Sequence, residues 1–506
     1  MTRHSSHKKQ YGLIDFLKSW QLTIGTVILF VFVQICQRYI LFDMEQTRVF
    51  VYEADKIAAQ LSSVGGVSDF IALWLQQFFA ISYVAPLVVA LLYGGLTWLL
   101  QRVCSMVVER DLLLVEMIIS WLPAVFLFVY TEDKIFFLTG HIAMLISVLG
   151  LWCYATCLSG RLRPLRLILI PLLFLVEGFV SSTCVWVMVL GMMLIAICRK
   201  EWREVGTIVL SSLLMLFLAQ RYCIAVGAEE LFSPDIFTIR IGGDATMIWV
   251  WLSSLLLIAI VILNVLKDRV RDTTISVVLA FSIVLLTGCF SYKSHKIEET
   301  HESLWLQRQI DTGNVVEAFK YCERHINNLY IANIYSYLLS TIGRLGDSNI
   351  FEEEEQLIIG SSESIIVRRH LMTLNYYIGY VAGAQREAFE LNEPTEGMMR
   401  PRALMILAKT NIIQGNYALA DKYLSHLKNT LFYRSWAQSY SRFLWDDKAV
   451  EADEELGSRR KAIEIESIPE RWTAMKYLVS QIAAASPTLP ATQYVDAYAN
   501  MGAYDK

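Results

Sequence analysis

The residues best placed to do chemistry are acids that follow directly on apolar runs of the chain. Asp43 and Glu45 come at the end of the first such run, and Glu132 and Asp133 lie in a later loop. A carboxylate can take a proton from a hydroxyl group or hold a divalent cation against a phosphate. Two acids in a polar loop also arise by chance, so the alternative is a set of solvated carboxylates at a membrane surface.

Ionisable side chains inside the apolar runs form a second group of candidates. Burying them in lipid is costly, which makes each one a functional-site hypothesis. Glu116 lies about one turn inside its run, where water or Arg110 could pair with it, and His141 lies near the acidic loop that contains Glu132. Glu177 falls close to the tip of a predicted hairpin. For each of them, a structural hydrogen bond is the competing interpretation.

The chain lacks the motifs of several large enzyme classes. It has no glycine-rich phosphate loop, zinc-ligand cluster, nucleophile elbow or kinase signature. The formal net charge is −4 and no stripe of basic and aromatic residues is present, so nucleic acid is not an expected partner. Of the nine cysteines, only Cys322 belongs to the polar C-terminal part, which therefore has no disulfide framework.

The elements that would position these residues are mostly membrane-spanning helices. Hydrophobic residues make up 55% of the 506, charged residues only 18%, and the mean hydropathy is +0.43. Soluble proteins usually carry about a quarter charged residues. The apolar residues crowd into the part that ends near Phe290, and from Ser291 onward the composition is that of a soluble helical protein. We therefore predict a transmembrane domain at 1–290 and a second domain at 291–506.

The transmembrane domain contains about nine runs long enough to cross a bilayer, for which about 20 apolar residues are needed. Lys and Arg concentrate in alternate loops, beginning with the segment before the first run, and cytoplasmic loops retain these residues. The N-terminus is therefore expected in the cytoplasm and the second domain on the outer face. The expected location is the bacterial cytoplasmic membrane, with residues 291–506 in the periplasm. The predicted spans are Trp20–Phe42, Ala80–Leu100, Leu112–Tyr130, Ile135–Leu158, Leu165–Val180, Ser181–Cys198, Val205–Ala225, Met247–Leu266 and Thr273–Phe290.

One segment leaves this topology open. Leu165–Cys198 can form either one long tilted helix or a hairpin that turns near 177–182. A single helix would reverse everything after it and put two basic loops outside, so the charge pattern favours the hairpin.

The second domain carries a repeated pattern typical of helix pairs. Gly313 and Gly415 are each followed by Asn, and by Ala five residues beyond the Gly. The two glycines lie 102 residues apart (415 − 313), three times a period of about 34. Gly383 and Ala388 show the same Gly-to-Ala spacing. The pattern resembles the tetratricopeptide repeat (TPR), which implies a curved stack of helix pairs with a concave binding face.

The first acidic loop resembles that of the GT-C membrane glycosyltransferases. In that superfamily the first outer loop carries an acidic D-x-D-like motif and amphipathic interfacial helices. Here the motif is D-x-E, and Ser68–Phe79 is an amphipathic stretch that follows it. Some members also carry an exterior repeat domain. The resemblance implies a polyprenyl-phosphate-linked sugar as the donor.

The same resemblance implies roles for individual residues. Asp43 and Glu45 would be the base and the metal ligands, and Glu132 and Asp133 would supply the second acidic loop. Contacts to the lipid phosphate or the substrate would come from Arg48, His141, Arg221 and Arg240.

A further resemblance carries no activity with it. Gly65-Gly66, followed by Phe70, Gln76, Gln77, Phe78, Phe79 and Pro86, is similar to an uncharacterised multi-pass family of Bacteroidota.

The sequence thus predicts an all-α protein in which a polytopic transmembrane helix bundle precedes an extracytoplasmic TPR-like domain. Two functions fit this architecture, and in both the protein contacts membrane lipids. One is a GT-C-like glycosyltransferase that uses a divalent cation and binds a protein or glycan acceptor on the repeats. The other is a non-catalytic scaffold that recruits envelope proteins through them. The enzyme interpretation predicts that the acids gather at an outward-facing cavity. The scaffold interpretation predicts scattered acids and an apolar patch on the repeats.

Overall fold

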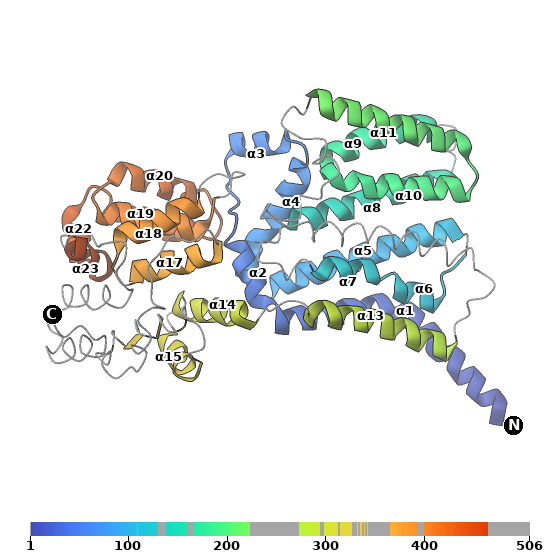
Figure 1. Ribbon diagram of the computed structural model, residues 1–506, viewed down its shortest axis with the longest axis horizontal. Helices are drawn as coiled ribbons and strands as arrows, with labels where there is room; N and C mark the ends of the chain where they lie inside the picture. The colour runs from blue at the N-terminus through green and yellow to red at the C-terminus, as the bar shows by residue number, and fades with distance from the viewer. Residues whose placement is uncertain are drawn as a thin grey trace. The chain divides into compact units, whose positions relative to one another are not determined.

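The computed structural model of the chain is helical in the part that it describes (Figure 1). That part comprises 2–108, 110–129, 138–159, 166–222, 273–293, 298–311, 314–325, 365–377, 379–392, 399–463 and isolated positions between 331 and 342. The chain divides into two compact units. The first contains Met1–Glu45 and Ala54–Lys296, and the second contains Gln46–Glu53 and Ile297–Lys506. The all-α prediction is confirmed for the described residues.

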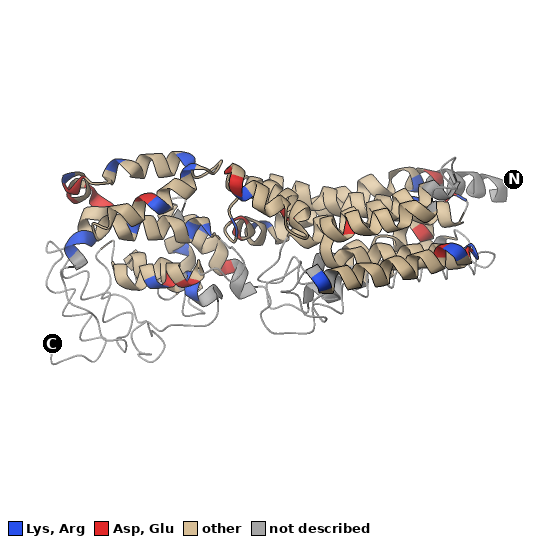
Figure 2. Ribbon diagram, turned by 90° about the horizontal axis from the view of Figure 1, so that it is seen from above, with Lys and Arg blue, Asp and Glu red and all other residues tan. Residues whose placement is uncertain are grey.

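Four helices of the first unit are long and apolar enough to cross a membrane. They are Asp15–Cys36, Val84–Val108, Leu138–Thr156 and the segment Leu167–Cys198, which is interrupted by a turn at Ser182–Cys184. Shorter apolar helices lie at Leu114–Val125 and Ile275–Leu286. Figure 2 shows few charged residues along the long helices of this unit, whereas charged residues recur throughout the helices of the second. The first unit therefore has the helices that membrane association requires.

The core of the first unit forms where α1, α4, α5 and α8 pack together. Gly94 of α5 makes the approach of α1 possible, because a Cβ at this position would lie 2.5 Å from Oγ1 of Thr26. The helices of the unit are α1 (Thr2–Cys36), α2 (Arg38–Glu45), α3 (Ala54–Leu61), α4 (Gly66–Gln76), η1 (Gln77–Ala80), α5 (Val84–Val108), α6 (Leu114–Ile119), α7 (Leu122–Val129), α8 (Leu138–Ser159), α9 (Arg166–Ser181), η4 (Ser182–Cys184), α10 (Val185–Cys198), α11 (Trp202–Tyr222) and α13 (Thr274–Lys293).

The segment from Leu167 to Cys198 reverses direction at η4. The end of α9 lies beside the start of α4, where the Gly65 N–H donates to the Phe179 carbonyl over 2.8 Å. The end of α10 lies at the opposite end of the bundle, where Arg199 donates to the carbonyl of Met106 near the end of α5. Ser182, with φ of +52°, makes the turn. This is the hairpin that the distribution of basic residues favours.

The second unit is built from antiparallel helix pairs. Its helices are α14 (Glu298–Asp311), α15 (Val315–Arg324), α17 (Ile365–Tyr377), α18 (Val381–Leu391), α19 (Pro401–Ile413), α20 (Tyr417–Lys428), α21 (Arg434–Tyr440), η8 (Ser441–Phe443), α22 (Asp447–Ala452) and α23 (Glu454–Ile463). The pair α17–α18 packs on α19–α20 through α18 and α19. Small residues fill the contacts within the pairs, and Ala384, Ala408 and Ala420 are fully buried.

The turn glycine of the middle pair differs from the one expected from sequence. Gly379 lies between α17 and α18 with φ of +88°, as Gly415 lies between α19 and α20 with φ of +77°. These two glycines are 36 residues apart (415 − 379), and Ala384 follows Gly379 at the expected five-residue spacing. Gly383 is inside α18, where a Cβ would lie 2.3 Å from the ring of Tyr380. The spacing is right, but its assignment to Gly383 is wrong by one helical turn.

Candidate functional site

The first predicted acids lie together on α2 without facing the same way. Glu45 is buried and Asp43 is half-buried. On a helix, residues two apart lie on nearly opposite sides, so the register of α2 does not present both carboxylates to one cation. The described residues contain no group of three or more His, Cys, Asp or Glu that could hold a metal ion.

The other predicted site residues are dispersed or lie outside the described part. Glu132, Asp133 and Arg240 belong to the residues that the structure does not describe. His141 is buried on α8, with its ring centroid 5.5 Å from that of Tyr93 on α5. Arg221 is exposed in the last turn of α11, and Arg48 belongs to the second unit.

A polar cluster that includes Asp69 joins the elements at one end of the bundle. Asp69 of α4 accepts hydrogen bonds from Gln60 and from Thr139 of α8, both over 2.7 Å. The neighbouring Ser68 donates to the Val180 carbonyl at the end of α9, also over 2.7 Å. Sequence reasoning placed Asp69 in an amphipathic stretch but did not propose it as a site residue. The signal in the sequence is that Asp69 is the single charged residue of the stretch Ser68–Phe79.

Two further acids of the bundle are buried with polar partners. Arg110 forms a two-pronged ion pair with Glu116, at 2.7 Å and 3.0 Å, and the Leu113 N–H donates to the same carboxylate. Tyr154 donates to Glu204 over 2.6 Å. The paired state of Glu116 agrees with the structural interpretation of this residue, because an ion-paired and capping carboxylate stabilises the start of α6.

In the second unit, the most unusual feature is an extended segment, residues 46–53, which we call the strap. Its backbone is bound by two hydrogen bonds from strap N–H groups. The Val49 N–H donates to the Met399 carbonyl over 2.8 Å, and the Tyr52 N–H donates to the Asn429 carbonyl over 2.7 Å. The strap thus binds at one end of the α19–α20 pair, where Met399 precedes α19 and Asn429 follows α20.

Side chains fix the strap at both ends. Gln46 donates to the Tyr433 hydroxyl over 2.5 Å, and Asn429 donates to the Glu53 carboxylate over 3.0 Å. Phe50 and Val51 are 3% and 7% exposed. Sequence reasoning missed this segment. The signal was present as the run Val49–Tyr52, four β-branched or aromatic residues in an otherwise polar loop.

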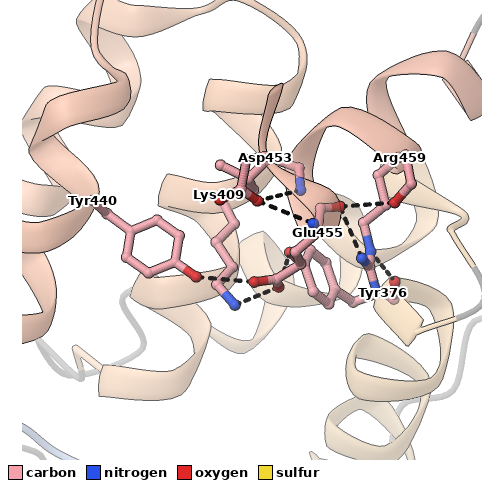
Figure 3. A network of polar contacts seen from close by, with 8 residues as sticks. Tyr376, Lys409, Tyr440, Asp453, Glu455 and Arg459 are labelled. Atoms are coloured by element: carbon pink, nitrogen blue, oxygen red, sulfur yellow. Dashed lines mark hydrogen bonds and ion pairs between the residues drawn. The ribbon is translucent and has the colours of Figure 1, made fainter. Parts of the chain in front are cut away.

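A polar network centred on Glu455 fastens α23 to the stacked pairs (Figure 3). Tyr376 and Lys409 both donate to Oε1 of Glu455 over 2.6 Å, and Tyr440 donates to Oε2 over 3.0 Å. Asp453 caps the first turn of α23 by accepting from the Glu455 and Leu456 N–H groups. Each oxygen of the Glu455 carboxylate therefore has a donor from another helix.

Electrostatics within this network favour the charged form of Glu455. Burial alone would raise the pKa of Glu455, but Lys409, Tyr376 and Arg459 together hold it below its usual value. Burial raises the pKa of Tyr376 well above its usual value, so this hydroxyl remains a donor. Burial lowers the pKa of Lys409, against the opposing effect of Glu455. A largely buried salt bridge with fixed hydroxyl donors is an arrangement that stabilises the fold.

Two adjacent arginines of α23 cap the ends of two helices. Arg459 donates to the Tyr376 carbonyl at the end of α17 over 2.9 Å. Arg460 donates to the carbonyls of Ile412 and Ile413 at the end of α19, over 2.9 Å and 3.0 Å. The last carbonyls of a helix have no partner within it, and a cation there also interacts favourably with the helix dipole. The arginines therefore hold α17 and α19 in register.

Comparison with known proteins gives a family but no activity. No curated protein and no solved structure matches the chain. A family model described as a family of unknown function (DUF6057) matches residues 14–498. Because this match covers nearly the whole chain, the protein belongs to the DUF6057 family of unknown function.

Proposed function

We propose that this protein is a multi-pass scaffold of the bacterial cytoplasmic membrane, whose second unit is a TPR-like module that binds extended segments of envelope proteins. The observation that carries the proposal is the strap. The second unit holds this extended segment through two backbone hydrogen bonds, and Val49 of the segment packs against the hydrophobic cluster of α19 and α20. Main-chain bonds of this kind provide affinity, and pockets for side chains provide specificity, in known modes of peptide recognition.

The strap also supports the proposed placement of the second unit. Residue 46 follows α2 directly, and residue 298 begins α14. An even number of membrane crossings must therefore separate the strap from α14 for both to lie on one face. The eight spans predicted after the first meet this condition. With the N-terminus in the cytoplasm, both the strap and the second unit would be extracytoplasmic.

The distribution of the acids favours the scaffold over the enzyme. Asp43 and Glu45 point in different directions from α2, and the buried Glu116 and Glu204 have structural partners. The scaffold interpretation expects such dispersed acids.

The test uses a fluorescently labelled peptide with the strap sequence Gln-Thr-Arg-Val-Phe-Val-Tyr-Glu and the full-length protein in detergent. Phe50→Ala should loosen the strap, since Phe-to-Ala changes in cores cost about 3–5 kcal/mol. This variant should bind the peptide at least about tenfold more tightly than the wild type, a difference of about 1.4 kcal/mol. Circular dichroism of the variant checks that the helices are retained.

The matched control is a chain in which Val49→Cys and Met399→Cys form a disulfide that keeps the strap in place. It should not bind the peptide. The proposed peptide site would be excluded if the Phe50→Ala protein bound a peptide of the same residues in scrambled order equally tightly. It would also be excluded if this variant kept its helices but did not bind the strap peptide.

A GT-C-like glycosyltransferase is the second candidate, favoured by the polar cluster that includes Asp69. Polar side chains of α4 and α8 and a backbone carbonyl at the end of α9 meet at one end of the apolar bundle, and an enzyme for a lipid-linked sugar would need a polar site there. General-base catalysis contributes about 10²–10⁴-fold. Asp43→Asn should therefore lower transfer from a polyprenyl-phosphate-linked sugar by that factor. Transfer unaffected by Asp43→Asn would exclude Asp43 as the base.

A further inference from the structure

Among the described acids of the bundle, Glu177 is the one that has a buried carboxylate oxygen without a hydrogen-bond partner. Glu177 of α9 is 7% exposed, and within the described residues its Oε2 atom has no hydrogen-bond partner. It forms no ion pair there, in contrast to Glu116, which Arg110 holds with two hydrogen bonds. Glu177 is thus a buried carboxyl group without a balancing cation.

The side chain of Glu177 points into the bundle. Its Oε1 atom would lie 2.6 Å from a Cβ on Gly150, which is in the middle part of α8, and the Met188 sulfur of α10 would lie 2.8 Å from the same Cβ. Gly150 therefore provides the space that the carboxyl group occupies. A hydroxyl pair lies one turn away, where Ser147 donates to Ser181 and Ser181 donates to the Glu177 carbonyl.

The helices packed against α9 provide no ion pair to Glu177. η4 and α10 contain no charged residue. Asp69 of α4 is engaged by Gln60 and Thr139, Glu204 of α11 accepts from Tyr154, and His141 of α8 lies against Tyr93. The arginines of α11, Arg203 and Arg221, are exposed. An isolated carboxylate in such surroundings is far more costly than the neutral acid.

We infer that Glu177 is a proton-binding site within the membrane bundle, held as an uncharged acid against Gly150. The protein would carry one exchangeable proton at this position, whatever the second unit binds. This inference does not depend on the proposed scaffold function.

A neutral carboxyl group in an apolar setting has a characteristic reaction with dicyclohexylcarbodiimide. The acid O–H adds across one C=N bond of the carbodiimide: the proton goes to nitrogen and the carboxyl oxygen bonds to the central carbon. The acyl group then shifts from that oxygen to nitrogen and gives a stable N-acylurea. Nothing leaves, and no other reactant is needed. An ion-paired carboxylate lacks the proton that the first step requires.

The experiment treats membranes containing the full-length protein with dicyclohexylcarbodiimide and maps the adducts by peptide mass spectrometry. Glu116 is the matched internal control, because it is equally buried but paired with Arg110. We expect the adduct on Glu177 and none above background on Glu116. Glu177→Gln should abolish the adduct without changing the circular dichroism spectrum. An unmodified Glu177, or equal modification of Glu116, would overturn the inference.

Discussion

At the scale of single residues, the bundle depends on glycines that leave room for a neighbour. Gly150→Ala would place a methyl group within 2.6 Å of Glu177 Oε1 and 2.8 Å of Met188 Sδ. Overpacking of this kind costs about 1–3 kcal/mol. We expect a lower thermal midpoint for the purified protein, measured by circular dichroism.

Gly206→Ala provides the comparison for this change. Gly206 is also inside a helix, and a Cβ there would have nothing within 4 Å. Alanine is about 1 kcal/mol better than glycine in a helix interior, so this variant should be neutral or slightly stabilised. Equal destabilisation by both substitutions would mean that the space at Gly150 is not the cause.

The pKa of Glu455 leads to a prediction about acid stability. Because the pKa is lower in the folded unit than the ordinary value of 4.5, the folded state favours the charged carboxylate. That stabilisation is complete above the unfolded pKa and is lost as the pH falls through the folded pKa. The thermal midpoint of the second unit should therefore decrease when the pH is lowered below about 4.5.

Glu455→Gln removes the titrating group and serves as the control. It keeps an acceptor for Tyr376 but loses the charge that faces Lys409. The variant should be less stable at neutral pH, and its midpoint should depend less steeply on pH in the acid range. An unchanged acid slope would assign that slope to other carboxylates.

At the scale of elements, the arginines of α23 act as caps for helices that are distant in sequence. Arg460→Ala leaves the carbonyls of Ile412 and Ile413 without their donor. Hydrogen bonds to charged groups contribute about 1.5–3 kcal/mol, so we expect a loss of about that size in the free energy of unfolding. Chemical denaturation followed by circular dichroism would measure it.

Arg442 is the matched arginine in the same region. Its side chain is 70% exposed and lies 3.8 Å from Asp453, a surface pair of the kind that contributes little. Arg442→Ala should change the free energy of unfolding by less than about 0.5 kcal/mol. A similar loss for both variants would show that charge, and not capping, is responsible.

The elements also show which features were predictable from sequence. The reversal at η4 agrees with the hairpin that the charge pattern favours, since a single crossing of 165–198 would have placed the two later basic loops outside. The helix pairs follow from the Gly-to-Ala spacing. The register of the middle pair was wrong because Gly379 and Gly383 are each followed by Ala after five residues. Only the backbone distinguishes them, through the positive φ of Gly379.

The candidate site was harder to predict than the fold. Acids can be found in a sequence, but whether each has a partner depends on residues that are distant along the chain. Arg110 is close to Glu116 in sequence and could be anticipated, whereas Tyr154 and Glu204 are 50 residues apart. The strap is the extreme case, because the partner of the Val49 N–H is the carbonyl of Met399, 350 residues later in the chain.

At the scale of the whole molecule, the strap requires that the first loop and the second unit share a compartment. The hydrogen bond between Val49 and Met399 brings their backbones close enough for a disulfide, which spans about 4.4–6.8 Å between Cα atoms. Val49→Cys with Met399→Cys should therefore crosslink in intact membranes. A protease site placed between the units, followed by a non-reducing gel, would show whether the fragments remain joined.

Val49→Cys with Met106→Cys is the control, because Met106 lies near the end of α5 beside Arg199, at the opposite end of the bundle from α2, which precedes the strap. This pair should not crosslink. Failure of the first pair in a folded protein, or success of the second, would contradict the shared compartment.

The strap also sets an order of events during biosynthesis. Val49 leaves the ribosome 350 residues before its partner Met399 (399 − 49). At about 5–20 residues per second, this delay is roughly 20–70 s. Throughout that time the strap lacks its backbone hydrogen-bond partners in the second unit. Assembly of the second unit is thus completed only when translation is nearly over. A nascent chain that stalls before residue 399 presents an apolar peptide that quality-control proteases can recognise.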